Sequence, residues 1–270
     1  MSQRSPRPDF VAQAGALAGG TSLLHIQSAV RKVPEITVYF WIVKLFTTAM
    51  GESTSDYLVY HINPYVAVML GGVGLAAAMA LQLAAPCYVA WTYWLAVLMV
   101  AIFGTMAADA LHIQLGVPYI VSTVLFAVAL AVVFAAWYTQ ERTLSIHSIV
   151  TLPRELYYWA TVMATFALGT AAGDLIAFTV GWGFFAAGLL FAGLIALPAL
   201  AYWRLGLNAI VAFWWAYILT RPLGASLADW LGKPQSTRGL GYGDGPVSLV
   251  FALLIIGFVG YLTVSRVDTP

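Results

Sequence analysis

The sequence predicts an all-α membrane protein with eight transmembrane helices, arranged as four parallel two-helix repeats in a pseudo-fourfold bundle. Composition is the first reason. Of the 270 residues, 61% are hydrophobic and only 9% are charged, and the mean hydropathy is +0.87. A soluble domain of this size cannot bury so much apolar surface. The second reason is a motif found four times: Phe or Tyr, then Trp, then Asp fifteen residues after the Trp. Such repetition indicates tandem structural units.

The four motif copies share a further pattern of small residues. Their Trp and Asp positions are Trp41 and Asp56, Trp94 and Asp109, Trp159 and Asp174, and Trp214 and Asp229. A glycine precedes each Asp by five residues, and another small residue precedes it directly; the glycines are Gly51, Gly104, Gly169 and Gly224. Small residues four apart let helix backbones approach closely in lipid. We therefore expect the first helix of each repeat to lie inside the bundle, and the second, whose span carries no charge, to face lipid.

Each repeat has room for two spans. An N-terminal segment, 1–33, precedes repeats at 34–90, 91–155, 156–207 and 208–270. Spans of about 20 apolar residues cross the hydrocarbon core, and without period-two alternation only helices satisfy their backbone there. Two spans per repeat make every repeat enter from the same side, as parallel copies. The expected spans are 36–58, 64–82, 92–111, 118–138, 156–178, 183–202, 209–231 and 247–264.

Basic residues predict the orientation. Two, Lys233 and Arg238, lie in the last hairpin, and two more, Lys44 and Arg221, lie within spans. The other eight lie before the first span, between repeats or after the last span. By the positive-inside rule, both termini are cytoplasmic. These eight are Arg4, Arg7, Arg31, Lys32, Arg142, Arg154, Arg204 and Arg266.

Four polar residues of the first inner helix follow one another at a spacing of four and so share one face, here called the polar ladder. They are Lys44, Thr48, Glu52 and Asp56. The fourth repeat carries Arg221 and Asp229 on the equivalent face. Carboxylates within spans are costly and mark functional sites by default. We therefore expect a path for a small cation or proton, with Glu52 and Asp56 as the metal-binding candidates. Its lining would be Lys44, Thr48, Glu52, Asp56, Asp109, Asp174, Arg221 and Asp229. The alternative is that the four Asp cap helix ends.

The two intramembrane cations, Lys44 and Arg221, are expected to pair with carboxylates, because lipid cannot host either alone. One interpretation is a buried structural ion-pair network. The other is a switch, in which Glu52 or Asp56 exchanges its cation for a substrate ion.

Three further features have less specific interpretations. Trp at the start of each inner helix is typical of an interfacial anchor, with a role in gating or substrate stacking as the alternative. His61 and His112 follow two of the motif Asp, but repeats 3 and 4 lack them, so loop or interfacial histidines are favoured over metal ligands. Residues 232–246 form a long, Gly-rich polar hairpin, either a lid over the outer mouth or a plain flexible loop.

The segments KVPEITVYFWIVKLFTTAMGESTSDYL and ILTRPLGASLADWL, with the four two-span repeats and their shared Trp, resemble a bacterial integral membrane protein family. That family is named only for its tandem repeat of unknown function. The resemblance covers about residues 32 to 265. It implies a multi-pass protein of the bacterial inner (plasma) membrane. The family has no settled activity, so the resemblance supplies no site residues.

The favoured function is a transporter of a small cation, with a divalent metal such as manganese, coupled to protons, as the first candidate. A passive cation channel is second, because Lys44 and Arg221 oppose free cation flow, and a non-transporting scaffold or sensor is third. An enzyme is not expected, since no metalloprotease or serine-hydrolase motif occurs. No cofactor is expected, and the single cysteine, Cys87, excludes an intrachain disulfide. The expected partners are the lipid bilayer and a cation or proton. The net charge of +1 implies no nucleic acid, and a homo-oligomer stays open.

Overall fold

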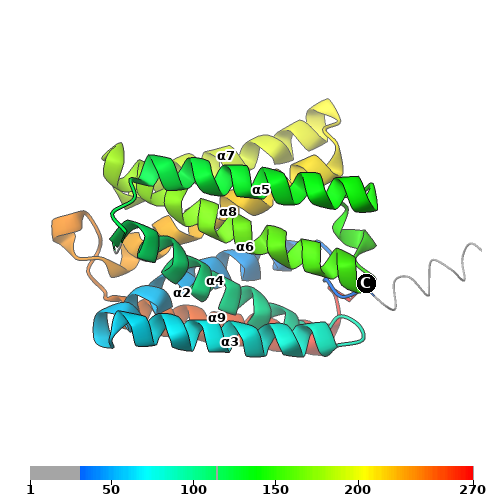
Figure 1. Ribbon diagram of the computed structural model, residues 1–270, viewed down its shortest axis with the longest axis horizontal. Coiled ribbons are helices and arrows are strands. Elements are labelled where there is room, and N and C mark those ends of the chain that lie inside the picture. Colours follow the sequence, from blue (N-terminus) through cyan, green and yellow to red (C-terminus); the bar gives the residue numbers. More distant parts are fainter. Residues whose placement is uncertain (1–30, 114, 270) are drawn as a thin grey trace, which may run out of the picture.

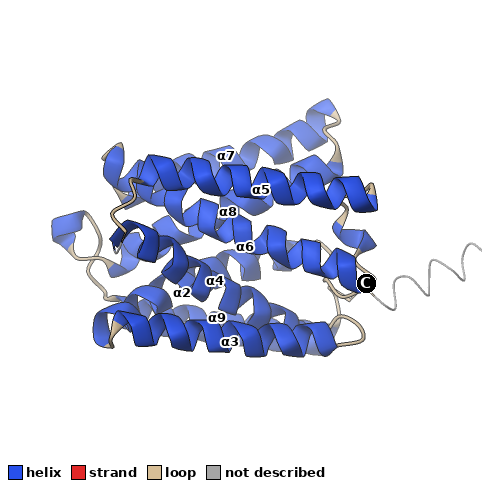
Figure 2. Ribbon diagram, in the orientation of Figure 1, coloured by secondary structure: helices blue, strands red, loops and turns tan. Residues whose placement is uncertain are grey.

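The computed structural model describes residues 31–113 and 115–269, and within these parts every regular element is helical (Figures 1 and 2). The predicted all-α class is confirmed. The expected N-terminal segment falls almost wholly outside the described residues. Short elements are η1 (Ile146–Ser148), a π-helical turn η2 (Leu175–Thr179) and η3 (Gln235–Thr237). The long helices are α2 (Val38–His61), α3 (Pro64–Ala84), α4 (Ala90–Ile113), α5 (Tyr119–Glu141), α6 (Leu152–Asp174), α7 (Phe184–Leu205), α8 (Ala209–Gly232) and α9 (Asp244–Ser265).

Local sequence explains several helix ends. The side chains of Asn63 and Asn208 accept hydrogen bonds from backbone N–H groups two residues on, at 3.0 and 2.8 Å, and so cap α3 and α8. Pro64 occupies the first position of α3, where no N–H is needed. Gly206 ends α7 with φ of 69°, a left-handed conformation that glycine adopts without strain.

Seven of the long helices, α3 to α9, are long and apolar enough to cross a membrane. The exception is α2, because its inner face carries the polar ladder. That face is nevertheless buried: Lys44, Thr48 and Glu52 are at most 4% exposed. Protein rather than lipid therefore surrounds the polar side of α2.

The first helices of the repeats pack in a closed ring, α2 on α4, α4 on α6, α6 on α8 and α8 on α2. The second helices lie outside this ring, and each packs mainly on the first helix of the following repeat: α3 on α4, α5 on α6, α7 on α8 and α9 on α2. Figure 1 shows the long helices side by side. In their apolar stretches α4, α6 and α8 are 44–56% buried, against 17–28% for the outer helices. The expected division into inner and outer helices is present.

The repeated glycines lie where neighbouring inner helices touch. A Cβ atom on Gly104 would lie 3.1 Å from Phe166 of α6, and one on Gly51 would lie 2.9 Å from the backbone carbon of Ala101 on α4. In the same way, Gly169 abuts Arg221 of α8 and Gly224 abuts Thr48 of α2. Close approach through small residues, as the sequence predicts, therefore operates at all four contacts of the ring.

Aromatic side chains close one end of the inner ring. Each motif Phe or Tyr lies 5.1–5.2 Å from its own Trp and 5.5–6.2 Å from the Trp of the next repeat. Trp94, Trp159 and Trp214 are only 2–4% exposed. The interfacial-anchor interpretation is therefore wrong for these three, because the close packing of inner helices draws the rings into the core. Trp41 alone is half-buried.

Candidate cation site

Arg221 lies at the centre of the inner ring and is completely buried. Its Nη2 atom forms an ion pair with Glu52 Oε2 at 2.5 Å. The same nitrogen donates to Thr170 Oγ1 at 2.8 Å and to the Thr105 hydroxyl, and Nη1 donates to the Thr48 carbonyl at 3.1 Å. Arg221 of α8 is thus held by α2, α4 and α6 together. The predicted pairing of Arg221 with an intramembrane carboxylate is confirmed.

The repeat explains why these groups converge. Glu52, Thr105 and Thr170 each directly follow a repeated glycine. Since the glycines bring the inner helices together, the next residue of each helix is carried toward the centre. The fourth equivalent position is Ala225, one turn after Arg221 on α8. Sequence reasoning did not assign Thr105 and Thr170 to the site, although their place after the glycine was a usable signal.

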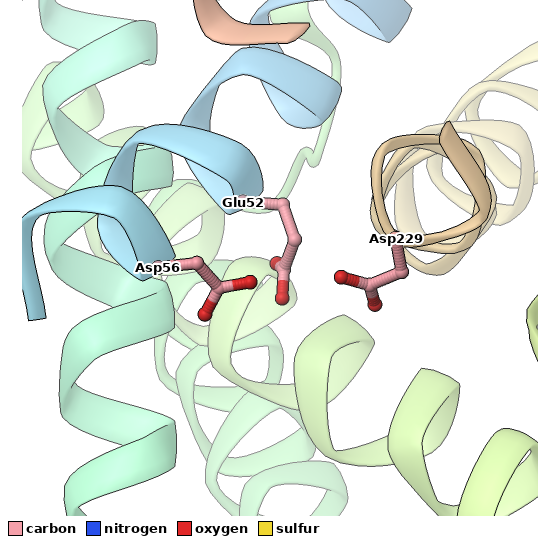
Figure 3. Close-up of side chains that lie close together, drawn as sticks. All are labelled: Glu52, Asp56 and Asp229. Atoms are coloured by element: carbon pink, nitrogen blue, oxygen red, sulfur yellow. The ribbon is translucent and has the colours of Figure 1, made fainter. Parts of the chain in front are cut away.

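Three carboxylates form a cluster beside this arginine. Oxygen atoms of Glu52, Asp56 and Asp229 all lie within 4.8 Å of one another. In Figure 3, Glu52 and Asp56 project from α2 one turn apart, and Asp229 points toward them from the facing helix α8. The structure therefore adds Asp229 to the predicted pair. Asp229 is only 5% exposed and accepts no hydrogen bond from the described residues.

Lys233 closes this three-carboxylate cluster from the hairpin between α8 and α9. Its Nζ atom forms an ion pair with Asp56 Oδ2, and it lies 3.9 Å from both Asp229 Oδ1 and Asp244 Oδ2. Burial opposes the charge of Lys233, but the nearby carboxylates, Asp56 first and Asp229 next, outweigh it and raise its pKa above the usual value. Lys233 therefore stays an ammonium throughout the physiological pH range. The spacing of four between Asp229 and Lys233 was a sequence signal for their contact, but not for the ion pair with Asp56.

The hairpin itself is folded tightly. Backbone N–H groups of Leu240, Tyr242 and Gly243 donate to carbonyls at the end of α8, at 2.7–3.1 Å. The Arg238 guanidinium donates a hydrogen bond at 3.0 Å to the carbonyl of Gly181, which lies in the connection between α6 and α7. A hydrogen-bonded turn of this kind argues against the plain flexible loop, and the lid interpretation stays a prediction.

The donor set suits a hard cation. Arg221 engages one oxygen of Glu52 and Lys233 engages one oxygen of Asp56; the second oxygen of each makes no hydrogen bond with the described residues. Carboxylate oxygens are the ligands preferred by Mg²⁺, Mn²⁺ and Ca²⁺. Neither candidate histidine joins them. His112 contacts Val117 O at 2.8 Å and Ser122 Oγ at 3.2 Å, and His61 contacts its own helix.

The motif carboxylates of repeats 2 and 3, Asp109 and Asp174, are half-buried and lie outside the three-carboxylate cluster. Within the described residues, no backbone N–H donates to any of the four motif Asp side chains. The helix-capping alternative therefore finds no support in the hydrogen bonds. Directly after Asp174, the helix continues as the π-helical turn η2.

Lys44 behaves differently from the prediction. It is completely buried, but among the described residues its Nζ atom has neither an ion pair nor a hydrogen bond. It lies 4.2 Å from the ring centre of Phe166 and 4.3 Å from that of Tyr217. The expected carboxylate partner is therefore wrong. Arg221 already occupies Glu52, so the lysine rests between aromatic rings, which attract cations through their faces.

One family model, described as Repeat of Unknown Function (DUF347), matches residues 39–86, 92–143, 157–207 and 212–268. The chain belongs to this family, and the resemblance inferred from its repeats is confirmed. No curated protein and no solved structure matches the chain.

Proposed function

We propose that this member of the repeat family is a polytopic transporter that moves a small cation through the three-carboxylate cluster. A divalent metal such as manganese, exchanged for protons, is the cargo that the site favours. The observation that carries the proposal is the convergence of Glu52, Asp56 and Asp229 within 4.8 Å at the centre of helices suited to a membrane. Carboxylates in such a place are costly unless they serve a cation or proton.

The packing supports a carrier rather than a passive channel. Below the carboxylates, Arg221, Phe166 and Lys44 are all completely buried. Two basic side chains and an aromatic ring thus fill the interior where a cation would have to pass. A carrier accepts such a plug, because its site opens to one side at a time. A channel requires a continuous path.

Proton coupling follows from the balance of charge. When a cation leaves, Arg221 and Lys233 are the ion-pair partners that the three carboxylates keep among the described residues. Carboxylates this close inside a low-dielectric site share protons readily. Binding a proton in place of the departing cation would restore the balance.

The transporter proposal also includes eight spans with pseudo-fourfold symmetry. Its support is that every inner helix touches the next through a repeated glycine, and every outer helix packs on the inner helix of the following repeat. Because α2 closes this ring between α4 and α8, we propose that it spans the bilayer although its sequence is less apolar than the others.

The proposed orientation places both termini in the cytoplasm of a bacterial cell and the α8–α9 hairpin outside the inner membrane. Its support is the asymmetry of basic residues. Cys87, between α3 and α4, is the only cysteine and would face the cytoplasm. We expect an impermeant maleimide to label it only in opened membranes, and a cysteine at the exposed Tyr242, in a Cys87→Ser background, to be labelled in intact cells. The opposite labelling pattern would reverse the topology.

Glu52→Gln is the substitution that tests the transport proposal most specifically. It keeps the shape of the side chain but removes a charge from the cluster. In proteoliposomes, we expect it to reduce divalent-cation flux by a factor of about 100 or more. This factor corresponds to a loss of about 3 kcal/mol in binding free energy when one carboxylate ligand is removed. Asp109→Asn should cause a milder loss, because Asp109 lies outside the cluster.

Folding of both variants is checked by gel filtration and thermal unfolding in detergent. Flux at the wild-type level in a folded Glu52→Gln protein would remove this residue from the transport site. A loss as large in Asp109→Asn would show that the path depends on all four repeats and not chiefly on the first and fourth.

A further inference from the structure

Lys233 is unlike the other charged groups of the site, because it belongs to the hairpin and not to an inner helix. Its ammonium lies among the side chains of Asp56, Asp229 and Asp244. It also lies 5.2 Å from the ring centre of Tyr60 on α2. Lys233 therefore stands between the three-carboxylate cluster and the outer end of the bundle. A cation approaching from that end meets a cation already paired with the carboxylates.

The formal charges make this arrangement selective. The cluster carries three negative charges, Arg221 and Lys233 supply two positive ones, and the sum is −1. Including Asp244, 3.9 Å from Lys233, makes every sum one unit more negative and leaves the differences between them unchanged. Exchanging Lys233 for a monovalent ion leaves the sum at −1, so nothing is gained to offset removal of the ammonium. Exchanging it for a divalent ion gives a sum of zero. In a site of low dielectric constant, one unit of charge changes the binding equilibrium strongly.

We propose that Lys233 is a tethered counter-ion that an incoming divalent cation displaces, and that this exchange excludes monovalent cations from the three-carboxylate cluster. The proposal rests on the proposed function, because it concerns the same cluster. Two further observations support it: Asp229 has Lys233 itself as its ion-pair partner, at 3.9 Å, and that partner sits on a flexible side chain. The carboxylate of Asp229, nine-tenths buried, accepts no hydrogen bond from the described residues and points into the cluster (Figure 3). The ammonium that now neutralises the cluster is held by a four-carbon chain, which can swing out without unfolding the hairpin.

The remaining lysines show that this arrangement is specific to Lys233. The chain has only three lysines. Lys32, near the other end of the bundle, pairs with the fully buried Glu155 at 2.8 Å, and Lys44 has no carboxylate partner among the described residues. Within the part of the chain that the structure describes, Lys233 is the one lysine that approaches several carboxylates, and it lies at the end of the cluster away from Arg221.

Binding of Mn²⁺ to the purified full-length protein tests the proposal. Free Mn²⁺ is measured by its electron paramagnetic resonance signal, for the wild type, Lys233→Met and Arg238→Met. Lys233→Met should bind Mn²⁺ at least about tenfold more tightly, because the competing charge is gone, and Na⁺ should now compete with Mn²⁺. Arg238→Met, which removes the same charge from the same hairpin, should bind like the wild type. Unchanged or weaker binding by Lys233→Met, or no binding by either protein, would overturn the proposal.

A second measurement uses the unaltered protein and does not depend on the folding of a variant. Acetylation of lysine by a water-soluble ester is followed by mass spectrometry, with Lys32 as the internal reference. Saturating Mn²⁺ should increase the acetylation rate of Lys233 several-fold relative to Lys32, since displacement exposes the ammonium, whereas Na⁺ at equal ionic strength should not. Slower or unchanged acetylation with Mn²⁺ would show that Lys233 stays paired with the carboxylates and is not displaced.

The two measurements separate this inference from the transport proposal. Tighter Mn²⁺ binding by Lys233→Met without cation flux in the wild type would support the tethered counter-ion and reject transport. Cation flux in the wild type, with Mn²⁺ binding unaffected by Lys233→Met, would support transport and reject the tethered counter-ion.

Discussion

Arg221→Met is expected to destabilise the folded protein by about 3–5 kcal/mol, because it leaves Glu52 charged and buried without its partner. Arg221 is completely buried and Glu52 is 4% exposed, so water cannot replace the lost ion pair. The substitution also removes hydrogen bonds to α4 and α6. The loss would appear as a fall of roughly 10 °C in the unfolding midpoint in detergent, taking about 2–4 °C per kcal/mol for a chain of this size.

Two variants serve as controls for Arg221→Met. The double substitution Glu52→Gln with Arg221→Met should recover much of the stability, since no buried charge is then left alone. Lys44→Met removes the other buried cation, which has no ion pair among the described residues, and should leave stability unchanged or raise it by about 1 kcal/mol. A loss in Lys44→Met as large as that in Arg221→Met would contradict the assignment of Glu52 to Arg221 alone.

Adding one methyl group at the inner-ring contacts should have the next largest effect on stability. In Gly224→Ala, the new Cβ would lie 2.7 Å from Thr48 Cβ and 3.0 Å from the Ala49 nitrogen. The Thr48 hydroxyl is itself bonded to the carbonyls of Leu45 and Thr220, so it cannot turn away freely. Overpacking of this kind costs about 1–3 kcal/mol or more. Gly51→Ala, which meets the Ala101 backbone, should behave alike.

Gly193→Ala is the matched control for the glycine substitutions. Gly193 lies in the outer helix α7, and a Cβ there would meet nothing within 4 Å. Alanine is favoured over glycine inside a helix by about 1 kcal/mol, so this variant should be neutral or slightly more stable. If thermal unfolding shows equal effects at Gly193 and Gly224, the close approach of α2 and α8 is not a determinant of stability.

The helices and the contacts between inner helices could be predicted from the sequence, because both depend on the spacing of residues along the chain. Four copies of one motif located the paired helices, and glycines four residues from another small residue located their contacts. A carboxylate partner for Arg221 was predictable too, because a buried cation needs one; that the partner is Glu52 was not.

Differences between repeats, and the path of the last hairpin, were not predictable in this way. Lys233 was assigned to an outer loop, and nothing in the spacing shows that the hairpin folds back over Asp56. Lys44 was given a carboxylate partner, since the sequence does not reveal that Phe166 and Tyr217 enclose it. The position of Trp94 near a helix end indicated an interfacial anchor, yet the close inner packing buries it. Each of these features depends on contacts between different repeats, which the spacing within one repeat does not specify.

Uptake of Mn²⁺ into proteoliposomes containing the wild-type chain tests the central claim most directly. We expect uptake that saturates with Mn²⁺ concentration, is matched by proton movement in the opposite direction, is insensitive to Na⁺ beyond ionic strength, and is lost in Glu52→Gln. Uptake no faster than in protein-free liposomes, for Mn²⁺ and for other divalent ions across the pH range, would contradict the transporter assignment and favour a membrane scaffold or sensor.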